Sequence, residues 1–327
     1  MGILCSGSFV ADILVPDLPY IGSPGSLTYA PNGICLSPGG HSANVAIDLA
    51  QLETDDVYTV GSIGEDEMGR FLVDQLKNRG VNPLPEIYEN STTAKNVALM
   101  VKGEDRRYIS ELTANSLLTT EHLQASINKV KPRIFYQGTL GGLPDIEKNL
   151  PEILENTQES LNFIDVIMPS NGWGYLESAY PSIHIFHANQ LEAYNLTGEN
   201  DPHRAISRLN NLGVTFIIIS DAQNGVVVGT QNHHVEMPAY QVTQRDATGA
   251  GDALSAGIIS SIQKNNITID DIVNPDIMIE LLLFGQAAGA ACVTGIGATT
   301  NVTMKNVKSI LEQQRDKVHS RTRMKRQ

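Results

Sequence analysis

The run Arg245-Asp246-Ala247-Thr248-Gly249-Ala250-Gly251-Asp252-Ala253-Leu254 constrains the fold more than any other part of the chain. Apolar residues follow at helical spacing, which predicts that Gly249, Ala250 and Gly251 open a helix. The first-turn N–H groups of a helix lack internal partners, and glycine lets an anion come close to them. Asp252 would then stand beside a site for negative charge. A carboxylate there suits the acceptance of a proton from a hydroxyl that attacks phosphorus.

The same letters also fit a capped helix after a turn, because Gly-x-Gly is common on its own. The longer pattern Asp-x-Thr-Gly-Ala-Gly-Asp-x-Leu resembles the C-terminal signature of the ribokinase-like (PfkB) family of carbohydrate and nucleoside kinases. This resemblance implies an α/β fold with a central, mainly parallel sheet flanked by helices and a small β-sheet lid. It also implies ATP as the phosphoryl donor, Asp252 as the general base, and Gly249, Ala250 and Gly251 as the anion hole.

A second glycine-rich helix start is Gly39-Gly40-His41-Ser42-Ala43-Asn44-Val45-Ala46. It resembles the N-terminal signature of the same family, which implies that Gly39, Gly40 and Asn44 bind sugar hydroxyls. An amide suits this task because it can donate to one hydroxyl and accept from another. A rival interpretation is the nucleophile elbow of a serine hydrolase, centred on Ser42. Asn44 stands where the elbow needs a small residue, which disfavours it.

The N-terminal segment from residue 2 to residue 10 is expected to form one buried strand, with Asp12 at its carboxyl end. Open α/β sheets place ligands at that edge, although an aspartate that merely begins a turn would fit the same position. Gly7-Ser8-x-x-Ala11-Asp12 resembles the family segment whose aspartate hydrogen-bonds two sugar hydroxyls. The resemblance therefore makes Asp12 a substrate-binding residue.

Two patches interrupt the α/β rhythm. Proline, glycine and serine punctuate residues 13–38, which favours short strands and turns over a helix, and residues 95–113 read as a β-hairpin. By resemblance, the two patches form a lid over the sugar and the contact of a homodimer. The whole chain, 1–327, is expected to be one kinase domain into which these lid segments are inserted.

From Asp66 onward, helical and strand patterns alternate, which predicts a mainly parallel sheet with helices on both faces. Strands are expected at 134–137, 163–167, 183–188, 216–220 and 226–228, after an earlier one at 57–63. Helices are expected at 68–79, 119–130, 145–156, 190–196 and 304–317, and residues 286–297 are expected to form an alanine-rich helix followed by a glycine loop.

Asn189-Gln190-Leu191-Glu192 resembles the family's Asn-x-x-Glu motif, which organises Mg²⁺ and phosphate through water. One carboxylate with nucleotide phosphates is a plausible shell for this ion. The same letters also fit a helix N-cap with its capping box. Asn189 is therefore a candidate nucleotide-binding residue, and Glu192 a candidate for Mg²⁺.

The resemblance assigns further positions to the nucleotide. The loop from Ser220 to Gly225 would contact phosphate, although a tight hairpin turn fits it too. Thr248 would join the phosphate site, and Gln286 would pack on the base. Asp246, with carbonyl groups of residues 294–297, would hold a monovalent cation such as K⁺.

The formal net charge of −13 disfavours nucleic acid and anionic membrane as partners. Cys5, Cys35 and Cys292 lie far apart, so we expect free thiols and a cytoplasmic protein. His233-His234 is expected in a surface loop, and the basic tail from Arg321 to be frayed. The P-loop and dinucleotide-binding motifs are missing from the sequence.

The substrate is expected to be a small sugar. Ribose kinases usually carry an asparagine two residues before the first-strand aspartate and an acid after the mid-chain strand. This chain has Val10 at the first position and Gln137-Gly138-Thr139-Leu140-Gly141-Gly142 at the second. Both changes argue against ribose and would leave room for a hexose or a larger group. Fructose is the first choice, partly because that activity is common in the family. A nucleoside is the second choice, and a ligand-binding sensor on a silent kinase fold is the alternative from another class.

Overall fold

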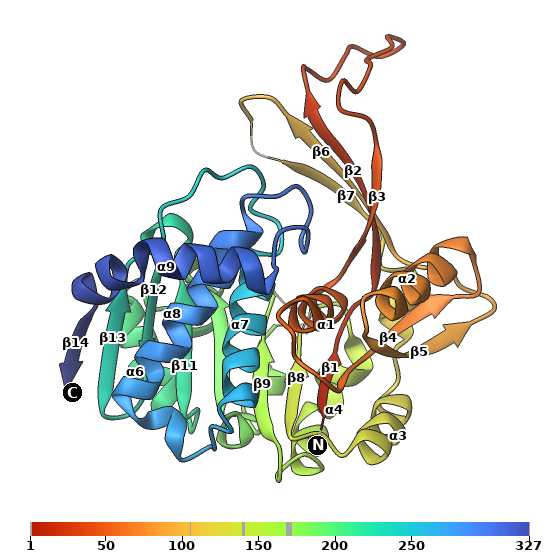
Figure 1. Ribbon diagram of the computed structural model, residues 1–327. Helices are drawn as coiled ribbons and strands as arrows, with labels where there is room; N and C mark the ends of the chain where they lie inside the picture. The colour runs from red at the N-terminus through yellow and green to blue at the C-terminus, as the bar shows by residue number, and fades with distance from the viewer. Residues whose placement is uncertain (1, 105, 139–140, 168–171, 327) are drawn as a thin grey trace.

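The computed structural model describes residues 2–104, 106–138, 141–167 and 172–326. Thr139 and Leu140, which belong to the run considered above for substrate choice, lie outside the described residues. The described chain forms a large sheet covered by helices and a small sheet that projects from one end of it (Figure 1). This is the α/β architecture with a small additional sheet that the sequence predicted.

The large sheet has the strand order β14-β13-β12-β11-β10-β9-β8-β1-β4-β5. Neighbouring strands from β11 to β5 run parallel, and β12, β13 and β14 add to the sheet in antiparallel fashion. The strands are β1 (Ile3–Ser6), β4 (Val57–Gly64), β5 (Asn82–Tyr88), β8 (Ile134–Gln137), β9 (Leu161–Asp165), β10 (Ile185–Asn189), β11 (Phe216–Ser220), β12 (Val226–Gly229), β13 (His233–Met237) and β14 (Arg323–Arg326).

Helices cover both faces of this sheet, and alternate strand residues supply the two apolar cores. In β1, Ile3 and Cys5 face one core and Leu4 faces the other, as the period of two in a strand requires. The first core contains α1 (His41–Gln51), α2 (Glu67–Asn78), α7 (Ala250–Lys264), α8 (Pro275–Cys292) and α9 (Met304–Arg321). The second contains α3 (Thr120–Val130), α4 (Pro144–Glu155), α5 (Gln190–Thr197) and α6 (Pro202–Asn211).

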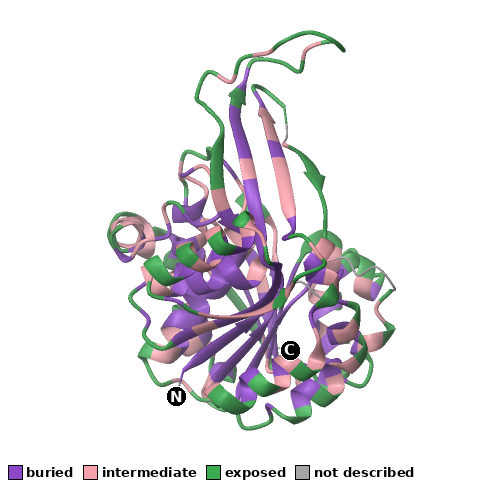
Figure 2. Ribbon diagram, turned by 90° about the vertical axis from the view of Figure 1, so that its right-hand side faces the viewer, coloured by how far each residue is buried: buried purple, intermediate pink, exposed green. Residues whose placement is uncertain are grey.

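The small sheet has the order β3-β2-β6-β7 and confirms strands in both patches expected to form the lid. Its strands are β2 (Val10–Leu18), β3 (Cys35–Gly39), β6 (Lys95–Val101) and β7 (Arg107–Ser110). Figure 2 shows that this sheet becomes exposed toward its far end, whereas the interior of the large layer is buried. Only a few apolar side chains, around Val15 and Val101, form a core of its own.

The chain crosses from one sheet to the other earlier than expected. The single strand predicted for residues 2–10 is wrong: β1 ends at Ser6, and β2 begins at Val10 in the small sheet. Asn115 fixes the crossing, because its side chain accepts a hydrogen bond from Phe9 N at 3.0 Å and donates one to Phe9 O at 2.9 Å. Asp12 therefore lies within β2 rather than at the end of β1.

Other differences concern charged or proline-containing segments. His233-His234 lies in β13 with His234 buried, and Arg323–Arg326 forms the edge strand β14, so the expected surface loop and frayed tail are both wrong. Strand β5 and helix α6 were not predicted, and α8 begins eleven residues before the expected start at 286. All three cysteines are free, as expected. By length and composition α8 could span a membrane, but most of it is buried inside the protein.

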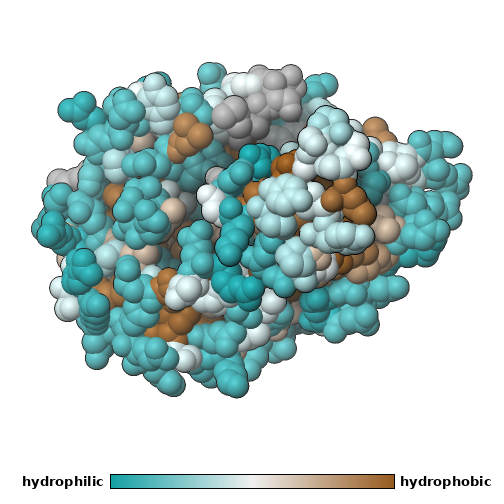
Figure 3. Space-filling view, turned by 90° about the horizontal axis from the view of Figure 1, so that it is seen from above, coloured by the Kyte–Doolittle hydropathy of each residue, from teal (hydrophilic) through white to brown (hydrophobic). Residues whose placement is uncertain are grey.

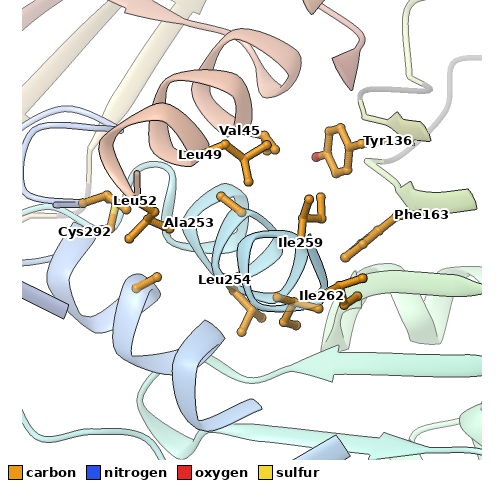
Figure 4. Packing of buried hydrophobic residues seen from close by; sticks show 14 of the residues in the cluster. Val45, Leu49, Leu52, Tyr136, Phe163, Ala253, Leu254, Ile259, Ile262 and Cys292 are labelled. Atoms are coloured by element: carbon orange, nitrogen blue, oxygen red, sulfur yellow. The ribbon is translucent and has the colours of Figure 1, made fainter. Parts of the chain in front are cut away.

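Helix α7 is the centre of the first core. Its apolar residues Ala253, Leu254, Ile259 and Ile262 pack among side chains of α1, α8 and the large sheet (Figure 4). Fully buried aliphatic side chains stabilise a fold by both transfer from water and close packing. The first turn of α7, which carries the signature residues, is thereby anchored by burial of the helix behind it.

We predict that Ile259→Ala lowers the free energy of unfolding by about 2–5 kcal/mol, because Ile259 is fully buried and its truncation leaves a cavity. Urea denaturation of the purified protein measures the change. Leu191→Ala is the control, since Leu191 is 62% exposed and should change stability by less than about 0.5 kcal/mol. Equal effects for the two variants would contradict the described core.

Candidate active site

The predicted residues gather at the carboxyl edge of the large sheet, where several helices begin. Strand β1 lies between β4 and β8, so the chain adds β4 and β5 on one side of β1 and later adds β8 on the other side. Open α/β sheets bind ligands in the crevice at such a switch point. The first turns of α1, α5 and α7 carry Asn44, Glu192 and Asp252.

Asp252 is the third residue of α7 and is 6% exposed. Asn44 Nδ2 donates a hydrogen bond of 2.8 Å to Asp252 Oδ2, so the two sequence signatures meet directly. Burial raises the pKa of Asp252 above its ordinary value and Asp165 adds to this, while His41 and the Asn44 hydrogen bond oppose it. A carboxylate with a raised pKa is better matched to accepting a proton near neutral pH.

Gly249 shapes the turn that precedes Asp252. It is the N-cap of α7 with φ of 77°, and an added Cβ would lie 2.6 Å from Ala298. Both the backbone conformation and the lack of space require glycine here. The chain can therefore turn sharply into α7, whose first N–H groups have no partner within the helix.

Asp12 faces this turn from the small sheet. Asn96 Nδ2, on β6, donates a hydrogen bond of 3.0 Å to Asp12 Oδ1, and β2 and β6 pair Asp12 with Asn96 in register. A Cβ on Gly39 would lie 2.0 Å from Asp12 Oδ2, so glycine at this position gives the carboxylate its place. Burial raises the pKa of Asp12 to about 6, and the nearby charges of Asp252 and Asp246 contribute.

A cavity of about 210 Å³ lies on the other side of the first turn of α7. It brings together the predicted nucleotide residues Ser220, Gly225 and Gln286 with Ala250 and Gly251 of the expected anion hole. Residues that the sequence did not single out also line it, among them Tyr240, Gln241, Val242, Gln244 and Val293. The turn thus separates this cavity from Asp12 and Asn44.

Asn189 and Glu192 begin α5 and form a complete capping box. Glu192 N donates to Asn189 Oδ1 at 2.9 Å, and Asn189 N donates to Glu192 Oε2 at 2.8 Å. The capping-box interpretation is therefore confirmed, and it uses one of the two carboxylate oxygens of Glu192. Burial raises the pKa of Glu192. An oxygen donor held in place near the cavity fits Mg²⁺, which needs few direct protein ligands.

A buried hydrogen-bond network around Asp165 and His187 was not predicted from the sequence. Asp165 Oδ2 accepts from His187 Nδ1 at 3.0 Å, Ser255 Oγ at 2.9 Å and Tyr136 Oη at 3.2 Å, and His187 Nε2 lies 3.0 Å from Ser220 Oγ. Burial alone would raise the pKa of Asp165, but His187 outweighs it and holds the value low. Local sequence carries no signal for this network, since its members come from five separate elements: β8, β9, β10, β11 and α7.

The rival interpretation around Ser42 is wrong. Ser42 is fully buried, and its Oγ donates a hydrogen bond of 3.0 Å to Ser8 O. A nucleophile must reach a substrate and a base, and this hydroxyl has neither exposure nor a histidine partner among its described contacts. Gly40 and Asn44 on either side of it remain candidates for substrate binding.

A buried carboxylate at a helix N-terminus, with Asp12 and Asn44 on one side and a cavity on the other, suits a small-molecule kinase. A family model places the protein within that class: the chain belongs to the pfkB family of carbohydrate kinases, whose model matches residues 3–305. It is thus a phosphotransferase that acts on a sugar and uses ATP.

Curated relatives are similar along most of the chain. Fructokinase-2 of Solanum lycopersicum is 26% identical over 315 residues, which is 91% of this chain and 93% of the relative. Fructokinase-1 of Zea mays is 25% identical over 301 residues, or 88% of this chain and 91% of the relative.

Solved structures share the fold. A fructokinase with bound ATP from Xylella fastidiosa superposes with a TM-score of 0.80 at 24% identity, covering 96% of this chain and 99% of the other. A ribokinase from Thermotoga maritima gives a TM-score of 0.76 at 21% identity, covering 95% and 99%.

We predict that the KM for the sugar rises as the pH falls through about 6, because ionised Asp12 accepts hydrogen bonds from hydroxyls and its pKa is about 6. Initial-rate measurements on either side of this pH, at saturating ATP, test the effect. Asp12→Asn should bind sugar more weakly and show a flat KM profile. A wild-type KM that does not change with pH would count against the role of Asp12.

Proposed function

We propose that the protein transfers the γ-phosphoryl group of ATP to a hydroxyl of fructose. The observation that carries this proposal is the 2.8 Å hydrogen bond between Asn44 and Asp252. It joins the predicted sugar-binding residues to the first turn of α7, whose other side lines the cavity proposed for ATP. An attacking hydroxyl beside Asp252 would therefore lie next to the terminal phosphate.

In the proposed reaction, the sugar hydroxyl forms a new O–P bond as the bond from the γ-phosphorus to the β-phosphate oxygen breaks. Asp252 Oδ accepts the hydroxyl proton, and ADP leaves with the electrons of the broken bond. The N–H groups of Gly249, Ala250 and Gly251 stabilise the charge on the transferred group. One preorganised donor of this kind typically contributes about 3 kcal/mol to transition-state stabilisation.

Other residues bind and position the reactants. Asp12, Gly39, Gly40 and Asn44 hold the sugar, with Asp12 oriented by Asn96. Ser220, Gly225, Thr248 and Gln286 contact the nucleotide, together with Asn189 at the start of α5. Glu192 would hold Mg²⁺ through water, and the ion would neutralise phosphate charge when bound.

The preference for fructose has two supports. Val10 stands where ribose kinases usually carry an asparagine, and the run from Gln137 to Gly142 contains no acidic residue where they carry one. The curated relatives named above are fructokinases. A nucleoside remains the second candidate substrate, because the family includes kinases for nucleosides as well as sugars.

We also propose that two copies associate through the small sheet in the cytoplasm. Apolar side chains are exposed on that sheet and on the loop at its tip: Leu27, Tyr29, Ile34, Leu36 and Ile109. Figure 3, which looks down on this end of the molecule, shows apolar patches within a largely hydrophilic surface. Pairing two such sheets would remove apolar side chains from water.

We predict that Asp252→Asn loses at least about a thousandfold in kcat, because the amide cannot accept the proton although it fills the same space. Coupled-assay turnover with Mg-ATP measures the loss, and an unchanged thermal unfolding midpoint shows that the variant folds. Asp276→Asn is a matched control at the first turn of α8, and it should keep full activity. Substantial turnover by Asp252→Asn would exclude the proposed base.

We predict that ADP release with Mg-ATP is fastest with fructose in a panel of fructose, ribose, glucose, 2-keto-3-deoxygluconate, inositol, adenosine and inosine. The polar side chains of Asp12 and Asn44 should bind hydroxyls, so one polyol should exceed the rate in water alone. Turnover with a nucleoside would replace fructose but keep the mechanism. No turnover with any compound, despite bound ATP, would favour the sensor interpretation.

A further inference from the structure

The hairpin of the small sheet contacts the phosphate-binding turn through an arginine. Arg106, which precedes β7, places Nη1 3.3 Å from Asp246 Oδ1. The Asp246 side chain is 2% exposed, and that of Arg106 is 30% exposed. A carboxylate so deeply buried is costly without a compensating positive charge, and the guanidinium supplies that charge.

A second contact joins the same two segments. Tyr108 Oη lies 2.8 Å from Thr248 Oγ1, and the Arg106 guanidinium stands over the Tyr108 ring, 5.8 Å from its centre. Tyr108 thereby restricts where the arginine can lie. Arg106 and Tyr108 both come from the lid hairpin. Their partners, Asp246 and Thr248, lie within the three residues before Gly249.

The Asp246 carboxylate has hydrogen-bond donors at both oxygens even without Arg106. Oδ1 accepts from Thr248 N at 2.9 Å and Thr248 Oγ1 at 2.7 Å, and Oδ2 accepts from Gly297 N at 2.9 Å. With Arg106 added, Oδ1 has three donors and Oδ2 has one. This environment does not fit the monovalent cation that the family resemblance assigns to Asp246, because the positive charge beside this carboxylate is part of the chain.

We propose that Arg106 takes the place of the monovalent cation at Asp246, so that nucleotide binding by this protein does not require K⁺. The inference rests on the proposed function in one respect, the binding of ATP beside Gly249–Gly251. Arg106 is a positioning residue in this proposal: it acts on the phosphate site through Asp246 and Thr248.

The charges around the site explain why such a cation matters. Asp246 and Asp252 both raise the pKa of Asp12, so the three carboxylates lie close enough to affect one another. A polyphosphate adds further negative charge at the same place. Neutralising Asp246 lowers the repulsion that ATP meets. Because the neutralising group belongs to the lid, it reaches Asp246 when the lid holds the position described here.

Binding of the non-hydrolysable analogue AMP-PNP with Mg²⁺, measured by isothermal titration calorimetry, tests the proposal without any sugar. Each protein is titrated in KCl and in tetramethylammonium chloride at equal ionic strength. The variants are Arg106→Gln, which removes the charge, and Arg106→Lys, which keeps it. Arg107→Gln is the matched control, because neighbouring Arg107 pairs with exposed Glu104 instead.

We expect the wild type, Arg106→Lys and Arg107→Gln to bind AMP-PNP equally in both salts. Arg106→Gln should bind about tenfold more weakly in tetramethylammonium and recover affinity in KCl, since K⁺ can then occupy the vacated position. Wild-type binding that weakens when K⁺ is withdrawn would overturn the proposal. So would an Arg106→Gln variant that binds as the wild type does in both salts.

These measurements distinguish a failure of the proposed role of Arg106 from a failure of the proposed function. If the wild type binds AMP-PNP independently of K⁺ but phosphorylates no sugar in the panel, the proposed function fails and the role of Arg106 stands. If fructose is phosphorylated but binding requires K⁺, the role of Arg106 fails and the proposed function stands. A wild type that binds no AMP-PNP would overturn both.

Discussion

The active site depends on the close packing of α7 against α8. A Cβ on Gly257 would lie 2.8 Å from the Cα of Gly285, so the two helices approach closely only because both positions are glycine. Apolar contacts with α1 and the large sheet hold the rest of α7. The orientation of the first turn is therefore set by the folded core rather than by a ligand. N–H groups fixed in advance stabilise developing charge without a further cost of reorganisation.

Local arrangement, and not net charge, decides how an acidic protein can bind a polyphosphate. Asp12, Asp246 and Asp252 all lie near the site, and burial keeps the pKa of Asp12 and of Asp252 raised. Opposing positive charge comes from the N-terminal ends of α1, α5 and α7 and from Arg106. In the buried network behind the turn, burial lowers the pKa of His187, but Asp165 outweighs this and raises it.

The sequence predicted those strands and helix starts that depend on residues close together along the chain. Strands 134–137 and 216–220 match β8 and β11 to the residue, and the two glycine-rich signatures do begin helices whose Asn44 and Asp252 meet. The Arg106–Asp246 and Asp165–His187 contacts could not be predicted, because strand order alone decides which distant residues become neighbours. Strand β14 escaped for another reason: charged residues that protect an edge strand resemble those of a disordered tail.

The two hydrogen bonds between the Asn115 side chain and the Phe9 backbone affect how the substrate range of such a protein can change in evolution. Asp12 and Asn96 belong to the small sheet, whereas Asn44 and Asp252 belong to helices on the large one. The angle between the two sheets therefore sets the distance between these two pairs of side chains. A change at the crossing that Asn115 holds would alter which ligand sizes fit while leaving every ligand-facing side chain intact. In this architecture, the range of substrate sizes can therefore change without a change in the catalytic residues.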